Sequence, residues 1–229
     1  MKTYNILFIG NSYTYFNKMP TEYFEKIAES AGISVNISSV TRGGWTLVKH
    51  ACEEFEEGAK IAALLRENKY DYVVLQEQSF RPATEFEYFL KGASQLLEKI
   101  KPNGATPFFY GTWGRGEGSV ELGAYDLTHD SMTKKLVDAY DAAAKEFGCD
   151  VAQVGLAFDD VYKNHKEINL YDRDLSHPSK YGSYLAALTI FAKMFDFDVR
   201  SVAFDAGFTK EENEILKNAA YAAANRKNI

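Results

Sequence analysis

Residues 4–14 of the chain are Tyr-Asn-Ile-Leu-Phe-Ile-Gly-Asn-Ser-Tyr-Thr, and this stretch decides the fold. Its uninterrupted apolar run, 6–9, is typical of a parallel strand that is buried on both faces. The run ends at Gly10, and the next two residues, Asn11 and Ser12, are of types that turn the chain and cap helices. A strand that passes straight into a helix predicts the first unit of an α/β domain.

The same alternation of short apolar runs and longer amphipathic segments continues to the end of the chain. We expect strands at 4–9, 33–40, 70–75, 106–110 and 150–153, and helices at 19–31, 47–65 (broken at Gly58), 86–100, 131–147, 156–164, 181–195 and 209–224. This order predicts one three-layer α/β/α domain over residues 1–229, with a parallel sheet of about five strands and a flavodoxin-like arrangement.

Composition excludes several classes of protein. The chain has 229 residues, 46% of them hydrophobic, and a net charge of −6, without the basic stripe that nucleic-acid binding requires. No apolar stretch approaches the roughly 20 residues of a membrane span, so we expect no membrane association. Cys52 and Cys149 are far apart and predict free thiols. The first strand begins directly after Met1-Lys2-Thr3, leaving no room for a signal peptide, so we expect a cytoplasmic protein.

The segments that follow the predicted strands are expected to converge, because ligands of parallel sheets bind beyond the carboxyl ends of the strands. These segments are small or polar: 10–12, 42–44, 76–79 and 111–113. The last of them opens a longer segment, 111–123, that contains five glycines. Its length and composition predict a mobile rim or lid over the site.

Two further residues give these loops a chemical interpretation. Asp174 lies three residues before His177, in a loop just ahead of a predicted helix. A carboxylate there can accept the imidazole Nδ1–H and leave Nε2 as a base. Alone, this pair also fits a turn with a surface histidine, and Ser12 alone fits a helix cap. Together the three residues predict a nucleophile, a base and the group that orients the base.

The sequence resembles the SGNH hydrolase superfamily, the GDSL-type esterases and lipases, in four blocks spread in the right order over nearly the whole chain. The blocks are Gly10-Asn11-Ser12, Gly44 in Gly44-Trp45-Thr46, Gln76-Glu77-Gln78-Ser79, and Asp174-Leu175-Ser176-His177. Two blocks depart from the usual pattern. Asn11 stands where the family has Asp. In the third block, Gln76-Glu77-Gln78-Ser79 stands where the family has Gly-x-Asn-Asp.

The resemblance implies a serine esterase that uses Ser12, His177 and Asp174 as its catalytic residues and needs no metal or cofactor. It places the oxyanion hole at the backbone N–H groups of Ser12 and Gly44 and at a side-chain amide. Gln78 is the preferred source of that amide, and Gln76 is the second candidate.

The expected partner is a small-molecule ester, with an O-acetyl group on a carbohydrate as the preferred class. Substrate-binding side chains are expected from the aromatic and polar residues that flank the loops: Tyr13, Trp45, Gln76, Glu77 and Trp113. Arg81 and Arg115 are candidates to bind a carboxylate on the substrate, although exposed arginines are common. The sequence indicates no particular oligomeric state.

Several alternatives stay open at this point. An acyltransferase or a thioesterase would use the same residues. A flavodoxin-like module could hold an FMN phosphate at the segment 12–14, at the start of the first helix. A non-catalytic carbohydrate-binding relative could have kept the pocket without the activity.

Overall fold

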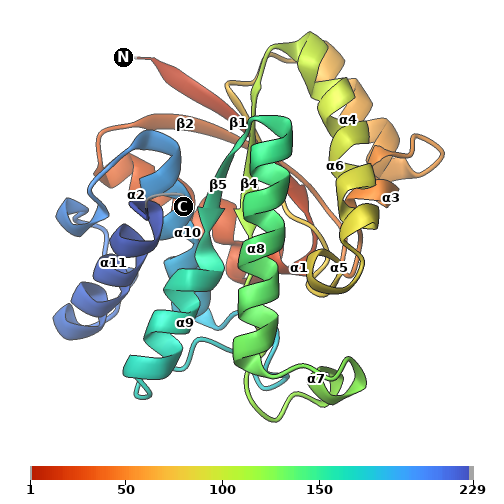
Figure 1. Ribbon diagram of the computed structural model, residues 1–229. Helices are drawn as coiled ribbons and strands as arrows, with labels where there is room; N and C mark the ends of the chain where they lie inside the picture. Colours follow the sequence, from red (N-terminus) through yellow and green to blue (C-terminus); the bar gives the residue numbers. More distant parts are fainter. Residues whose placement is uncertain (1, 227–229) are drawn as a thin grey trace.

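The computed structural model describes residues 2–226, which form a three-layer α/β/α domain (Figure 1). All neighbouring strands pair in parallel, in the order β2-β1-β3-β4-β5. The strands are β1 (Thr3–Gly10), β2 (Ser34–Thr41), β3 (Tyr72–Leu75), β4 (Thr106–Gly111) and β5 (Asp150–Gln153). The predicted fold class and the five-stranded parallel sheet are confirmed.

Helices cover both faces of the sheet. They are α1 (Ser12–Tyr15), η1 (Phe16–Lys18), η2 (Met19–Phe24), α2 (Glu25–Ser30), α3 (Leu47–Ala51), α4 (Glu56–Glu67), α5 (Arg81–Thr84), α6 (Phe86–Ile100), η3 (Lys101–Asn103), α7 (Val120–Ala124), α8 (His129–Phe147), α9 (Val154–Asn164), α10 (Lys180–Phe195), η4 (Val199–Ser201) and α11 (Lys210–Ala224). Within residues 2–226, no helix combines the length and the apolar character needed to cross a membrane.

The central strand β1 shows why the sheet is buried on both sides. Ile6 and Phe8 belong to a core with α2, α9, α10 and α11, whereas Leu7 and Ile9 belong to a second core with α3, α4, α6 and α8. All four side chains are fully buried. Because successive side chains of a strand point to opposite faces, an uninterrupted apolar run is what this position requires.

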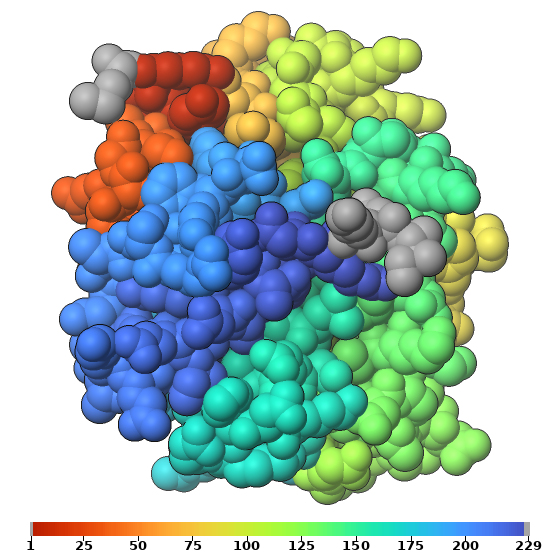
Figure 2. Space-filling model, turned by 60° about the vertical axis from the view of Figure 1, so that its left-hand side comes forward, coloured from red at the N-terminus to blue at the C-terminus, as the bar shows by residue number. Residues whose placement is uncertain are grey.

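The last helix completes one of the outer layers. Figure 2 shows α11 lying across the surface beside α9. A capping box begins this helix, because Thr209 accepts the N–H of Glu212 and the Glu212 carboxylate accepts the N–H of Thr209. The predicted helix 209–224 and its capping box are therefore confirmed.

Two element predictions need correction. The break in the predicted helix 47–65 lies at residues 52–55 and not at Gly58, which is inside α4. The segment 111–123 is only partly an open rim, because its first half is tied to the rest of the protein. Gly114 O accepts the Tyr171 hydroxyl, and Gly116 N–H donates to Leu175 O.

Candidate active site

The site is built around the turn at which β1 ends, at the carboxyl edge of the sheet, where Figure 1 shows α1 and α5. A Cβ atom at Gly10 would lie 2.6 Å from Gln76 Oε1, so only glycine fits here. That oxygen accepts the backbone N–H of Asn11 and the hydroxyl of Thr14, both at 2.9 Å. His50 Nε2 lies 2.8 Å from Gly10 O. Backbone groups of this buried turn are thus paired with side chains from the segment after β3 and from α3.

Ser12 begins α1, and its hydroxyl faces the loop that precedes α10. Its Oγ lies 2.8 Å from His177 Nε2. His177 Nδ1 is hydrogen-bonded to Asp174 Oδ2. With the Nδ1 proton donated to the carboxylate, Nε2 is free to accept the serine proton. The helix cap itself is Asn11, whose Oδ1 accepts the N–H of Tyr13, so the capping interpretation of Ser12 is wrong.

Asp174 is held as a carboxylate by its own loop. Its Oδ1 accepts the backbone N–H groups of Ser176 at 3.0 Å and His177 at 2.9 Å. Burial raises the pKa of Asp174, but these hydrogen bonds and the one from the His177 ring outweigh it, so the pKa lies below its usual value. The aspartate therefore stays ionised at neutral pH and can stabilise an imidazolium.

Two backbone donors remain free beside Ser12. Within residues 2–226, no acceptor is paired with the N–H of Ser12 or of Gly44. Gly44 has φ +69°, a conformation that favours glycine. Asn11 links the two loops, because its Nδ2 donates to Trp45 O at 3.0 Å. An aspartate could not make this bond, which gives a physical reason for the unusual asparagine.

The structure separates the two glutamines of the third block. Gln76 is fully buried, and both ends of its amide are used, since Nε2 donates to Glu77 O. Gln78 Oε1 accepts the N–H groups of Phe80 at 2.9 Å and Arg81 at 3.2 Å, which orients the amide. Among the described residues, its Nε2 has only a long contact, 3.4 Å, to Ser79 Oγ. The Gln78 amide nitrogen is thus the more available donor, because the Gln76 amide is fully buried and already bonded at its oxygen and its nitrogen.

The interpretation of Trp113 as a wall of the pocket is wrong. Its side chain is 0% exposed, stacked between Tyr13 at 4.5 Å and Phe158 at 4.0 Å. Its Nε1 donates to Ser176 O at 3.1 Å, and the Tyr13 hydroxyl lies 2.7 Å from Ser176 Oγ. These two aromatic residues position the loop that carries His177.

The other predicted substrate-binding side chains are also largely buried. Gln76 and Glu77 are 0% exposed and have no surface to offer a ligand, so this part of the prediction is wrong. Trp45 is 8% exposed, and the Arg42 guanidinium lies 4.7 Å from the centre of its ring. The sequence pattern located these residues near the site but could not tell contact with substrate from support beneath it.

Two further residues, which were not predicted from the sequence, hold His177 and the segment that follows it. The Phe16 ring stacks on the imidazole at 4.2 Å and 15°. Asn17 Nδ2 donates to Pro178 O at 3.0 Å and to Ser183 Oγ at 2.9 Å. Asn17 and Lys18 both adopt positive φ, 52° and 54°, and this turn brings Phe16 onto the ring. An asparagine shortly after the first helix was the one available signal, since asparagine tolerates this conformation.

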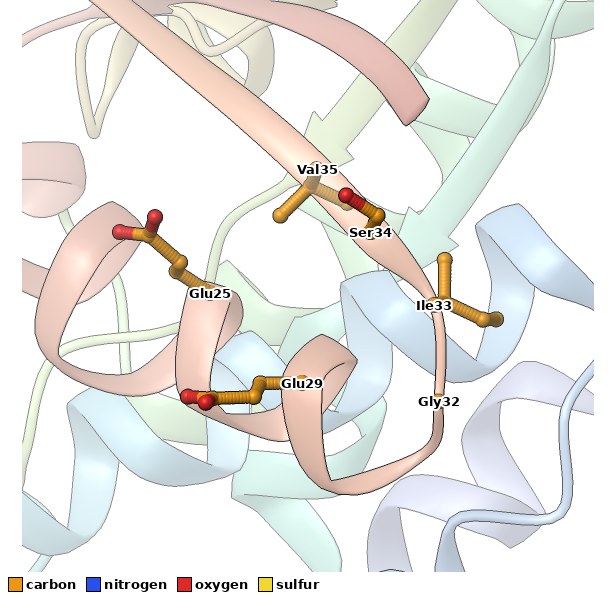
Figure 3. A pocket seen from close by; sticks show the side chains of 6 residues that line it. All are labelled: Glu25, Glu29, Gly32, Ile33, Ser34 and Val35. Atoms are coloured by element: carbon orange, nitrogen blue, oxygen red, sulfur yellow. The ribbon is translucent and has the colours of Figure 1, made fainter. Parts of the chain in front are cut away.

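Two other features lie outside this arrangement. Glu25 and Glu29 line a hollow of about 390 Å³ at the start of β2 (Figure 3), at the opposite edge of the sheet from Ser12.

His129, Asp130 and Asp159 form a group with the spacing of metal ligands. Lys163 Nζ already lies 3.0 Å from Asp130 Oδ1 and 2.9 Å from Asp159 Oδ1, so this group is satisfied as an ion-pair network.

Comparison with solved structures identifies the family. A protein from Slackia heliotrinireducens, described as a candidate SGNH hydrolase, is 34% identical, with a TM-score of 0.73, covering 84% of this chain and 100% of its own. The chain belongs to the SGNH hydrolase superfamily. This confirms the family and the SGNH type of hydrolase predicted from the four blocks, and it favours them over the FMN-binding alternative.

More distant structures share the SGNH fold. A DUF4886 family protein from Bacteroides uniformis has a TM-score of 0.82 at 20% identity, covering 97% of this chain and 95% of its own. An acetyl-xylooligosaccharide esterase from Geobacillus has a TM-score of 0.56 at 14% identity, with coverages of 90% and 97%. No family model and no curated protein sequence matches the chain.

The buried carboxylate of Glu77 connects two loops of this SGNH site. Its Oε2 accepts the N–H of Leu47, the first residue of α3, at 3.1 Å, and its Oε1 accepts the N–H of Gln78 at 2.5 Å. Burial raises the pKa of Glu77 to about 7, and Glu85 also raises it, although the two N–H donors and Arg81 lower it. One carboxylate thus spans the Gly44 loop and the Gln78 loop.

The raised pKa of Glu77 predicts a specific pH dependence of stability. Between pH 4.5 and about 7 the folded protein holds a proton that the unfolded chain releases, so this group's contribution to stability falls as the pH rises through that window. Glu77→Gln removes this titration. The unfolding free energy of the variant minus that of wild type should therefore increase with pH. From pH 5 to pH 8 this difference should rise by on the order of 2 to 3 kcal/mol.

Urea unfolding at several pH values measures this difference. Glu87→Gln, which removes an exposed carboxylate on α6, is the matched control. Parallel pH profiles for wild type and Glu77→Gln would contradict the assignment.

Proposed function

We propose that this SGNH hydrolase is a serine esterase that uses Ser12 as nucleophile, His177 as general base and acid, and Asp174 as the residue that orients the base. The hydrogen-bonded chain from Ser12 Oγ through His177 to Asp174 carries the proposal. In this arrangement the Ser12 hydroxyl, a potential nucleophile, lies 2.8 Å from the His177 ring, a potential base. The Asp174 carboxylate, whose pKa is lowered, lies on the far side of that ring.

Acylation would begin when Ser12 Oγ attacks the ester carbonyl carbon and His177 Nε2 takes the hydroxyl proton. The resulting oxyanion would face the free N–H groups of Ser12 and Gly44 and the Gln78 amide. Losing one such donor typically raises the barrier by about 3 kcal/mol. His177 would then protonate the departing alkoxide, which leaves an acyl-serine and a free alcohol.

Deacylation would repeat these steps with water. His177 would accept a proton from water as its oxygen attacks the acyl-serine carbonyl carbon. The second tetrahedral oxyanion would occupy the same donors. Its collapse would return the proton to Ser12 and release the carboxylic acid. No step requires a metal ion or an organic cofactor.

The substrate class we propose is a small-acyl ester, with O-acetyl on a carbohydrate as the preferred case. The acetyl-xylooligosaccharide esterase shares the fold, which makes such a substrate a natural candidate. An exposed aromatic ring also supports it. Tyr15, in α1 beside Phe16, is 42% exposed, and a Cβ at Gly43 would lie 3.1 Å from its hydroxyl. This places a ring available for stacking on a sugar next to the Gly44 loop.

Replacement of the nucleophile should abolish esterase activity. We expect Ser12→Ala and His177→Ala to lower kcat on p-nitrophenyl acetate by at least about 1,000-fold, because the attacking oxygen or its base is lost. Asp174→Asn should lower kcat strongly by removing the charge that stabilises the imidazolium. A series of p-nitrophenyl esters from acetate to octanoate measures both the activity and the acyl preference.

His165→Ala is the matched control for loss of a histidine, since His165 is paired with Glu167 outside the site. Equal rates for wild type and Ser12→Ala would show that the nucleophile lies elsewhere. A wild-type protein that binds acetylated oligosaccharides but hydrolyses none of the esters would favour a non-catalytic relative.

The exposed Tyr15 ring should contribute to carbohydrate binding. Tyr15→Ala is expected to raise KM for acetylated xylooligosaccharides by roughly 5- to 10-fold, because a stacking contact contributes on the order of 1 kcal/mol. The KM for p-nitrophenyl acetate should rise less, since this substrate has no sugar. Tyr221→Ala on α11 controls for loss of a partly exposed tyrosine. An equal rise in both KM values would contradict a sugar-stacking role.

A further inference from the structure

Arg115 is a largely buried cation beside the proposed active site. Its side chain is 12% exposed, and its guanidinium carbon lies 4.6 Å from the centre of the Phe80 ring. Its Nη2 is 3.5 Å from Ser79 Oγ, in the third sequence block. Removing a guanidinium from water is costly unless anionic or hydrogen-bonding partners replace the water.

The backbone around Arg115 is fixed on both sides. His129 Nδ1 lies 2.9 Å from Arg115 O, which ties this residue to α8. The next residue, Gly116, donates its N–H to Leu175 O at 2.8 Å, inside the loop that carries Asp174 and His177. The side chain therefore projects from a fixed position beside the His177 loop and not from a free surface loop.

The hydrogen-bonding capacity of this guanidinium is underused. Its Nη1 pairs with Glu121 Oε1 at 2.8 Å, but Glu121 is 53% exposed and belongs to the five-residue helix α7. The Arg115 Nε is buried, and it has no hydrogen-bond partner within residues 2–226. An exposed carboxylate held by a short helix gives weak compensation, so a ligand can replace it.

A short polar path joins Arg115 to Gln78, the side chain proposed to face the oxyanion. Ser79 Oγ, which contacts Arg115 Nη2, is also 3.4 Å from Gln78 Nε2, the proposed oxyanion donor. Arg115 also acts on the ring next to the nucleophile: burial raises the pKa of Tyr13, and the positive charge of Arg115 partly opposes this rise. A group on the substrate only a few atoms from the ester carbonyl would thus reach the guanidinium.

We propose that Arg115 binds a carboxylate carried by the ester substrate, and that Glu121 occupies this subsite in the free protein. This inference rests on the proposed esterase function and narrows its substrate class to acidic esters. The planar guanidinium matches a carboxylate with two parallel hydrogen bonds, and Glu121 already presents such a group there. The acid group belongs either to the acyl chain or to the alcohol, for example to a uronic acid.

Matched ester pairs test the subsite and distinguish these two sources. The acyl arm compares mono-p-nitrophenyl adipate with p-nitrophenyl hexanoate. The alcohol arm compares an O-acetylated methyl glucuronoside with the corresponding O-acetylated methyl glucoside. In one arm, wild type should prefer the acidic member, and Arg115→Gln should lower the acidic-to-neutral ratio of kcat/KM by roughly 10- to 100-fold.

Three further variants sharpen the test. Arg115→Lys keeps the charge but loses the planar fork, so its ratio should fall between those of wild type and Arg115→Gln. Glu121→Gln removes the competing carboxylate and should lower KM for the acidic ester. Arg66→Gln, which removes an exposed arginine from α4, controls for the change in net charge and should keep the wild-type ratio.

The outcomes separate this inference from the proposed function. No preference for the acidic member in either arm, or an equal loss on both members in Arg115→Gln, would overturn the subsite. If wild type hydrolyses no ester, the esterase proposal fails, and calorimetry with adipate and methyl glucuronoside then decides the subsite separately. Binding that Arg115→Gln abolishes would support it, and the absence of binding would overturn it.

Discussion

The strand β1 ends inside the protein, and the buried polar groups of its backbone must find partners where the chain turns; among the described residues, the N–H of Ser12 is left available. Three side chains meet this constraint: Gln76 accepts the N–H of Asn11, His50 pairs with Gly10 O, and Asn11 donates to Trp45 O. Gln76 directly follows β3, His50 lies in α3, and Asn11 belongs to the turn itself. The turn that presents Ser12 and the loops that surround it are therefore built as one unit.

The same constraint explains why these supporting groups are buried and uncharged at the turn. Burial lowers the pKa of His50 to about 4, so at neutral pH it is a neutral donor to a backbone carbonyl. Gln76 is an amide with both ends paired. A glycine at position 10 leaves space for the Gln76 amide, because any Cβ there would overlap it. The residues around Ser12 are thus fitted to one another as well as to the chemistry.

A second set of contacts fixes the position of His177. Tyr13, Trp113 and Phe158 form a continuous stack, and Tyr13 and Trp113 each hydrogen-bond Ser176, the residue before His177. Phe16 covers the outer face of the imidazole. Ser12 and His177 are 165 positions apart in the chain, and rigid aromatic packing holds their side chains at hydrogen-bond distance. This preorganisation is what efficient proton transfer requires.

The fold could be predicted from the sequence because strand and helix periodicities are local patterns. The positions of the four blocks, at strand ends and in a late loop, predicted that Ser12, Asp174 and His177 lie together. It could not predict which side chains near the site face the substrate. Trp113 and Tyr15 are both aromatic residues next to a strand end or turn, yet Trp113 is buried and Tyr15 is exposed. That difference depends on Phe158 and Ser176, which are remote in sequence. The positions of Phe16 and Asn17 depend on two consecutive residues with positive φ, which no periodic pattern reveals.

The proposed mechanism depends above all on the reactivity of the Ser12 hydroxyl. Covalent labelling with a fluorophosphonate, followed by intact-protein and peptide mass spectrometry, tests it most directly, because such reagents react with a serine that a neighbouring base activates. We expect one adduct per chain, located on Ser12, and much slower labelling when His177 is replaced by alanine. An adduct on another residue, or labelling at an unchanged rate in the His177→Ala variant, would contradict a Ser12 nucleophile that His177 activates.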